Sequence, residues 1–113
     1  MTKDEVFEYL SKKYELDYIK GPITGASYLL FKDISLLTDL DCEEDSVRIY
    51  KKFFIDGFGG DITISPSYNY LNIKDLDIIE KQLDKLFKDY RNCLKKQKEY
   101  KVQQKVDKIK EMF

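Results

Sequence analysis

The feature that most constrains the fold is the composition of the last part of the chain. The 41 residues from Ile73 to Phe113 include neither proline nor glycine, the two residues that most often interrupt a helix. A continuous helix of this length would extend about 60 Å. The remaining body of roughly 90 residues is only about 30 Å across. The sequence therefore predicts a helix that projects from the body, bends back on it or packs against another molecule.

The apolar residues of this predicted helix fall in two groups at helical spacing. The first group runs from Leu76 to Leu94 and should face the core. Residues 95–99 are polar and separate it from the second group, which consists of Val102, Val106, Ile109 and Phe113. Because a helix with no packed face is marginally stable, we expect the second group to contact a partner, such as a second copy of the chain in a homodimer.

Earlier segments predict one short helix and several strands. Thr2 and Glu5 have the spacing of a capping box, which indicates a helix over residues 3–14. Residues 27–32, 47–55 and 61–65 have the composition and alternation of strands, with a glycine-rich hairpin loop between the last two. Residues 34–40 fit either a strand or a short helix, and Asn72 fits the N-cap of the last helix. The predicted class is α+β, with a small antiparallel sheet of three to four strands between the two helices.

The charge of the chain is unevenly distributed. Residues 1–90 carry 12 basic and 18 acidic residues, whereas residues 91–113 carry 8 basic and 3 acidic ones, so a net charge of −1 conceals an acidic body and a basic end. We therefore expect a compact α+β domain over 1–90 and a basic extension of the last helix over 91–113, called the C-terminal segment below. This segment belongs to the same domain or forms a dimerisation arm.

Composition argues against catalysis. The chain has no histidine and only two cysteines, Cys42 and Cys93, which excludes histidine bases, the usual nucleophilic triads and histidine or four-cysteine zinc sites. Asp89 with Glu99 and Lys101 matches the bare string of metal-dependent nucleases, but that string belongs on a strand and here lies in the predicted helix. We expect no enzyme activity, no cofactor and no metal.

A run of carboxylates forms the first candidate binding surface. Five of the seven residues in the segment 39–45, called the acidic loop, are Asp39, Asp41, Glu43, Glu44 and Asp45. A calcium loop would need glycine at its sixth position and glutamate where Tyr50 stands. The remaining interpretations are a solvated loop and a negatively charged surface for a basic partner.

The C-terminal segment forms the second candidate surface. Its basic residues include Arg91, Lys95, Lys96, Lys98, Lys101, Lys105 and Lys108. They fit a solvated helix face, a contact with nucleic-acid phosphates or a contact with an acidic protein. Because lysine outnumbers arginine, a nucleic acid would be bound through its backbone rather than read by base.

Aromatic residues supply the remaining candidates. Phe58 stands on the glycine-rich loop 57–60, which lacks the spacing of a phosphate-binding loop, and the ring fits either a partner anchor or internal packing. Tyrosine occurs nine times, with Tyr68 and Tyr70 close together before the last helix. Tyrosine is enriched in interfaces, but the codon usage of an AT-rich gene is an equal explanation.

In size, charge partition and lack of catalytic groups, the chain resembles the small inhibitors encoded by phages and mobile elements, including anti-CRISPR proteins. The resemblance lies in general character and rests on no motif. It implies a non-catalytic protein in the host cytoplasm that blocks a defence nuclease or its nucleic-acid site through the acidic loop or the C-terminal segment. No apolar run is long enough to span a membrane, and Met1 leads directly into charged residues. The alternative is a dimeric nucleic-acid-binding or regulatory protein that uses the lysines of the last helix.

Overall fold

The computed structural model describes residues 1–21, 25–57 and 60–112, with the side chains of the last helix described as far as Glu99. The elements in chain order are α1 (Lys3–Tyr14), β1 (Asp17–Ile19), β2 (Tyr28–Phe31), β3 (Ile34–Thr38), β4 (Ser46–Tyr50), β5 (Phe53–Ile55), β6 (Ile62–Ile64), β7 (Tyr68–Asn72) and α2 (Leu76–Met112). The predicted α+β class is confirmed. The described residues form seven strands in two sheets, more than the three to four expected.

The first helix has the predicted bounds. The Thr2 hydroxyl accepts the Glu5 backbone N–H at 3.2 Å, and the Glu5 carboxylate accepts the Thr2 N–H at 3.2 Å, so the capping box is confirmed. Val6, Phe7 and Leu10 are the buried residues of α1. They pack into the core that α1 shares with the sheet and α2.

The main sheet has five antiparallel strands in the order β1-β2-β3-β4-β7. Residues 34–40, which fitted either a strand or a helix, supply β3. Leu29 pairs with Leu37 and Leu30 pairs with Ser35, so Leu36 lies in a β-bulge. Leu36 and Leu37 are both fully buried. The bulge thus lets consecutive leucines of one strand enter the core.

The prediction of one strand over residues 47–55 is wrong. β4 lies in the main sheet between β3 and β7, whereas β5 pairs only with β6 in a separate two-stranded sheet. Lys51 and Lys52 form the corner between these strands, and both are exposed. A straight strand would place Lys51 on its apolar face. The chain leaves the sheet at this residue instead, because a buried, unpaired ammonium group is costly.

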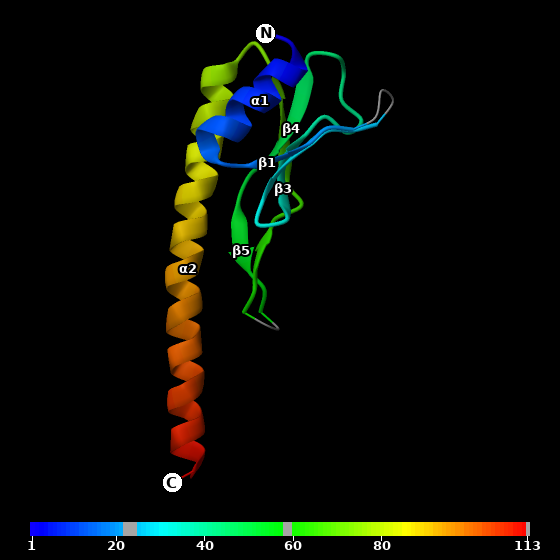
Figure 1. The fold of residues 1–113 in the computed structure, drawn as a ribbon. Helices are drawn as coiled ribbons and strands as arrows, with labels where there is room; N and C mark the ends of the chain where they lie inside the picture. The colour runs from blue at the N-terminus through cyan, green and yellow to red at the C-terminus, as the bar shows by residue number, and fades with distance from the viewer. Residues whose placement is uncertain (22–24, 58–59, 113) are drawn as a thin grey trace.

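α2 is one continuous helix and passes residues 90 and 91 without a break. It begins at Leu76 rather than after Asn72, so the predicted N-cap is wrong. Asn72 ends β7, and its side-chain oxygen accepts the Lys74 N–H at 2.9 Å in the turn before the helix. Gln97 donates to the carbonyl oxygen of Gly60 at 2.8 Å, which attaches α2 to the body near the end of the part whose side chains are described. Figure 1 shows the helix continuing well beyond the strands, and the molecule measures 63 × 26 × 23 Å.

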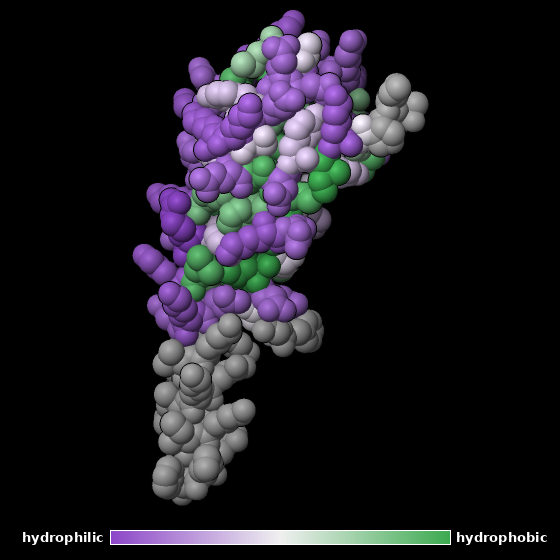
Figure 2. All heavy atoms as spheres, viewed as in Figure 1, coloured by the Kyte–Doolittle hydropathy of each residue, from purple (hydrophilic) through white to green (hydrophobic). Residues whose placement is uncertain are grey.

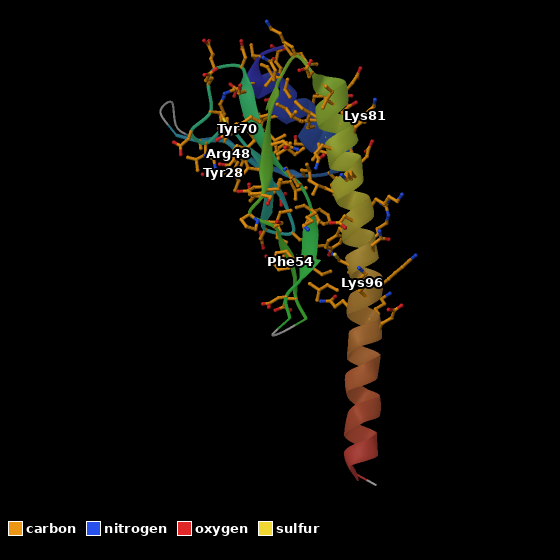
Figure 3. The ribbon with its side chains drawn as sticks, turned by 180° about the vertical axis from the view of Figure 1, so that it is seen from behind. Tyr28, Arg48, Phe54, Tyr70, Lys81 and Lys96 are labelled. Atoms are coloured by element: carbon orange, nitrogen blue, oxygen red, sulfur yellow. The ribbon has the colours of Figure 1, made fainter. Side chains whose placement is uncertain are left out.

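The core lies between the two helices and one face of the main sheet. Leu29, Leu37 and Ile49 from the sheet and Leu83 and Leu86 from α2 are fully buried in it. Figure 2 shows hydrophilic side chains over most of the viewed surface, with hydrophobic side chains reaching it in bands across the middle of the body. The face of the sheet that points away from the helices is visible from behind in Figure 3.

Candidate functional site

A row of one residue from each strand crosses the outer face of the main sheet. In register order the row is Ile19, Tyr28, Thr38, Arg48 and Tyr70. Because successive residues of a strand point to opposite faces, these positions share the face away from the core residues Leu29 and Ile49. Figure 3 labels Tyr28, Arg48 and Tyr70 on the sheet, seen from behind. Tyr70 is 56% exposed and Ile19 is 50% exposed.

Arg48 stacks on one ring of a tyrosine cluster on this face. The Arg48 guanidinium carbon lies 4.7 Å from the centre of the Tyr68 ring, which is cation–π distance. Tyr68 makes edge-to-face contacts with Tyr70 at 5.3 Å and with Tyr50 at 6.1 Å between ring centres. We call Tyr28, Arg48, Tyr50, Tyr68 and Tyr70 the tyrosine face. The rings of Tyr50, Tyr68 and Tyr70 pack against one another, and Tyr28 lies in the same row two strands from Arg48.

Neighbouring charges and hydrogen bonds shift the pKa values of Arg48 and Tyr70 on this face. Burial lowers the pKa of Arg48, but the neighbouring Tyr68, Tyr70 and Asp41 raise it by more, so the guanidinium stays charged. The Tyr68 and Tyr70 hydroxyls lie 3.4 Å apart, and the hydrogen bond between them raises the pKa of Tyr70. The Tyr70 phenol is therefore neutral at physiological pH, and its hydroxyl can act as a hydrogen-bond donor or acceptor to a partner.

One side of the acidic loop adjoins the tyrosine face. Asp41 Oδ2 lies 3.4 Å from Arg48 Nη2, and the Asp41 side chain is 79% exposed. Asp41 and Glu43, together with Cys42 and Tyr70, line a shallow hollow at the end of the row. The structure thus brings two sequence-predicted residues of the acidic loop beside Tyr70, which the sequence singled out separately.

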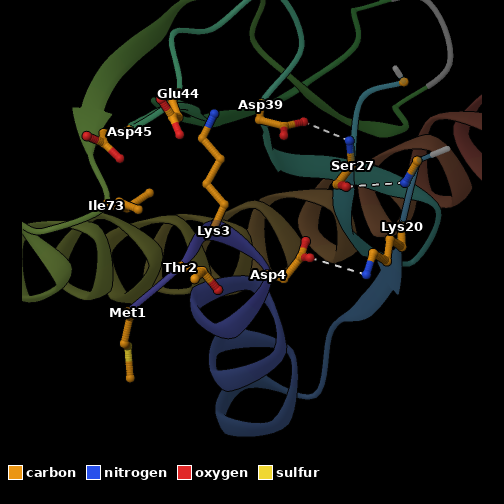
Figure 4. Close-up of a pocket in the computed structure, with 12 residues that line it drawn as sticks. Met1, Thr2, Lys3, Asp4, Lys20, Ser27, Asp39, Glu44, Asp45 and Ile73 are labelled. Carbon is orange, nitrogen blue, oxygen red and sulfur yellow. Dashed lines mark hydrogen bonds and ion pairs between the residues drawn. The ribbon is translucent and has the colours of Figure 1, made fainter. Parts of the chain in front are cut away.

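The other side of the acidic loop faces the start of α1. A hollow between them is lined by both acidic and basic residues, including Lys3, Lys20, Asp39, Glu44 and Asp45. Figure 4 shows the Lys3 side chain extending toward the loop, where its ammonium group donates to the Glu43 carbonyl at 2.7 Å. Asp39 accepts the Ser27 N–H at 2.7 Å and so serves the loop structure. This hollow therefore carries charges of both signs.

The thiols are not activated nucleophiles. Burial raises the pKa of Cys42 and also that of Cys93, so each is protonated at neutral pH. In the described ranges 1–21, 25–57 and 60–112, no three cysteine, aspartate or glutamate residues gather as metal ligands.

The nuclease-like string is not assembled into a site. Asp89 and Glu99 both lie on α2, about 15 Å apart along its axis. The Asp89 carboxylate accepts the Phe53 backbone N–H at 2.6 Å, which assigns it a structural role.

The basic residues of the C-terminal segment are only partly described. Arg91, Lys95, Lys96 and Lys98 are exposed on α2. The side chains of Lys101, Lys105 and Lys108, and of the dimerisation candidates Val102, Val106 and Ile109, lie outside the described part of the structure, as do the whole residues Phe58 and Phe113. Dimerisation through this segment therefore stays a prediction.

Sequence reasoning missed two groups of residues. Tyr28 was assigned only to a strand and Arg48 only to a strand face, and their places in the row that ends at Tyr70 depend on strand order. Lys51, Lys52, Lys85 and Lys88 come together in a groove between α2 and the corner after β4. Alternation along residues 47–55 predicts that Arg48 and Tyr50 share a face, but nothing local pairs β4 with β7.

No known protein family, curated protein or solved structure matches the chain. Within the described residues, no helix combines the length and the apolar character that crossing a membrane requires.

Proposed function

We propose that this is a non-catalytic binding protein that uses the tyrosine face, with Asp41 and Glu43 beside it, to bind a basic protein surface. The observation that carries the proposal is the cluster of Tyr50, Tyr68 and Tyr70, with Arg48 on the Tyr68 ring, on the outer face of a five-stranded sheet. Tyrosine and arginine dominate binding energy at protein interfaces, because they contribute a large contact area and hydrogen bonds. Rings already fixed by their neighbours lose little entropy on binding.

Charge favours a basic partner. Arg48 is compensated by Asp41, while Glu43 is exposed and makes no ion pair among the described residues. Glu44 and Asp45 follow in the same loop, and residues 1–90 carry a net charge of −6. Such a surface attracts a positively charged protein and repels a nucleic-acid backbone.

We propose further that the partner is a nucleic-acid-binding protein, such as a host defence nuclease, and that this chain acts as a phage-type inhibitor. An acidic surface that occupies a basic nucleic-acid site competes with the phosphates that the site normally binds. The acidic loop beside an aromatic contact surface supports this mechanism. The inhibitor then works by stoichiometric occlusion and needs no turnover.

The test begins with capture of basic proteins from a host bacterial lysate, followed by calorimetry with the purified partner. We expect Tyr70→Ala to weaken binding at least tenfold, because Tyr70 is the most exposed ring of the row. The double variant D41K/E43K should slow association and reverse its salt dependence. Ile78→Ala serves as the control, since Ile78 is 51% exposed on α2 and lies outside the tyrosine face.

The occlusion mechanism makes a second measurable prediction. If the captured partner cleaves nucleic acid, one equivalent of the wild-type chain should block cleavage, and an excess of nucleic acid should relieve the block. The proposal is wrong if Tyr70→Ala and D41K/E43K bind the partner as tightly as Ile78→Ala. It is also wrong if bound partner retains full access to its nucleic acid.

A further inference from the structure

A second surface carries charge of the opposite sign. A groove between α2 and the corner after β4 encloses about 630 Å³. It is lined by Lys51, Lys52, Ser67, Lys85, Lys88, Asp89 and Asn92. We call it the lysine groove. Two of its lysines come from the corner and two from successive turns of α2, so the groove exists only in the folded chain.

The four lysines of the groove are free to bind an anion. The ion pairs among the described residues use Lys13, Lys20 and Arg48 and none of the groove lysines. Asp89 is the one carboxylate that lines the groove, and it accepts the Phe53 N–H. Four ammonium groups against one committed carboxylate leave the groove with a net charge of +3. In a body with an excess of acidic residues, this concentration of positive charge is unexpected.

The walls of the groove are fixed to each other. Gln82 of α2 donates to the carbonyl oxygens of Tyr50 at 3.1 Å and Lys51 at 3.3 Å. The bond from Phe53 to Asp89 attaches the other end of the corner to the same helix. These contacts hold the corner lysines beside the helix lysines, so the charges are brought together before any ligand binds.

We propose that the lysine groove binds the phosphate groups of a nucleic-acid backbone. Lysine supplies point charges that suit phosphate, and Ser67 and Asn92 add neutral hydrogen-bond donors. No arginine lines the groove, so base readout is not expected. The lining also includes no apolar side chain. Binding of an acidic protein would normally require an apolar contact area at the centre of the interface.

The positive charge continues along α2. Lys81 lies one turn before Lys85, and Lys95 and Lys96 lie about two turns after Lys88, on the same side by helical spacing. Figure 3 labels Lys81 and Lys96 near the two ends of this strip. The strip is about 22 Å long, which corresponds to about six phosphates of one strand of duplex DNA. The groove therefore forms part of a longer track for a backbone.

This inference does not depend on the proposed function, because the tyrosine face and the lysine groove share no residue. Tyr70→Ala should remove protein binding and leave DNA binding intact. The failure of one proposal is thus distinguishable from the failure of the other.

The test is fluorescence anisotropy with a labelled 20-nucleotide DNA, as a single strand and as a duplex, between 50 and 200 mM salt. Loss of two phosphate contacts should flatten the slope of log K against log salt by about 1.8 for duplex and about 1.4 for single strands. At 0.1 M salt the K85Q/K88Q variant should then bind duplex about 60-fold more weakly. The control K12Q/K74Q removes the same charge from exposed lysines outside the groove.

Three results would overturn the inference. The first is no binding of either DNA at 50 mM salt. The second is equal affinity of K85Q/K88Q and K12Q/K74Q. The third is displacement of the DNA by poly-glutamate at equal charge concentration, which would assign the groove to acidic proteins. Circular dichroism of both variants must match the wild type, which separates loss of binding from loss of fold.

Discussion

Replacing Asp89 by alanine is expected to lower the free energy of unfolding by about 2 kcal/mol. The Asp89 carboxylate accepts the Phe53 N–H at 2.6 Å, and Phe53 is only 3% exposed. A hydrogen bond to a charged group contributes about 1.5–3 kcal/mol, and a buried N–H without an acceptor costs about 1–3 kcal/mol. Alanine has a higher helix propensity than aspartate, by about 0.5 kcal/mol, so the helix itself contributes nothing to the loss. The predicted loss therefore comes from the contact between α2 and β5 alone.

The conservative variant separates this bond from the charge of Asp89. Asp89→Asn keeps a side-chain acceptor for the Phe53 N–H, so we expect a loss below about 1 kcal/mol. The same substitution removes the one carboxylate of the lysine groove and should strengthen DNA binding. A single pair of variants thus tests both the hydrogen bond and the electrostatics of the groove.

Urea and thermal unfolding monitored by circular dichroism provide the measurement. A loss of about 2 kcal/mol should lower the melting temperature by about 8 °C in a domain of this size. Hydrogen exchange at the Phe53 amide gives a local readout and should accelerate in the alanine variant. The reasoning fails if Asp89→Ala stays within about 0.5 kcal/mol of the wild type, or if Asp89→Asn loses as much as Asp89→Ala.

Three further predictions concern the core, a titrating group and a cap. Leu83→Ala should cost about 2–5 kcal/mol in urea unfolding, because Leu83 is fully buried. Burial and the hydrogen bond to Asp84 raise the pKa of Tyr14 to about 12, whereas a tyrosine in an unfolded chain ionises near 10. The free energy of unfolding that depends on Tyr14 is therefore fully present below pH 10 and is lost as the pH rises to 12. Urea unfolding of Tyr14→Phe over the same pH range should not show this loss. Thr2→Ala should cost about 1 kcal/mol in thermal unfolding, and Thr2→Ser should restore most of it.

Local rules were sufficient for several elements of this fold. The capping box at Thr2 and Glu5 placed α1, because its hydrogen bonds join residues three apart in sequence. The hairpin of β5 and β6 was predicted from a short glycine-rich loop between two apolar segments. The absence of proline and glycine after Ile73 indicated the long helix, and α2 spans 37 residues. Each of these features is encoded within a few consecutive residues.

Elements that depend on distant partners were predicted poorly. β4 and β5 were joined into one strand, since alternation along 47–55 is the same whether the strands lie in one sheet or two. Sheet membership is decided by pairing of β4 with β7 and of β5 with β6. β1 and β7 were missed because each has a polar or exposed pattern and becomes a strand through its neighbour.

The candidate surfaces also include features that adjacent residues predict and features that depend on the tertiary fold. Charge counting identified the acidic loop, whose carboxylates are adjacent in sequence. It could not show that Asp41 and Glu43 adjoin a tyrosine face or that Asp39 is used internally. The count of basic and acidic residues also assigned positive charge mainly to the C-terminal segment. The lysine groove lies in the body, because folding brings the corner after β4 beside α2.

The amino-acid sequence alone established that this chain folds as α+β with a helix longer than its body, and that histidine chemistry is absent. These conclusions follow from composition and short-range periodicity, which can be read from the sequence without knowledge of the tertiary structure. Strand order and the contact between the corner and α2 created the tyrosine face and the lysine groove. Residues such as Arg48 and Tyr68, or Lys52 and Lys85, become neighbours only when the chain between them folds into a cooperative core, and no local sequence pattern predicts that contact.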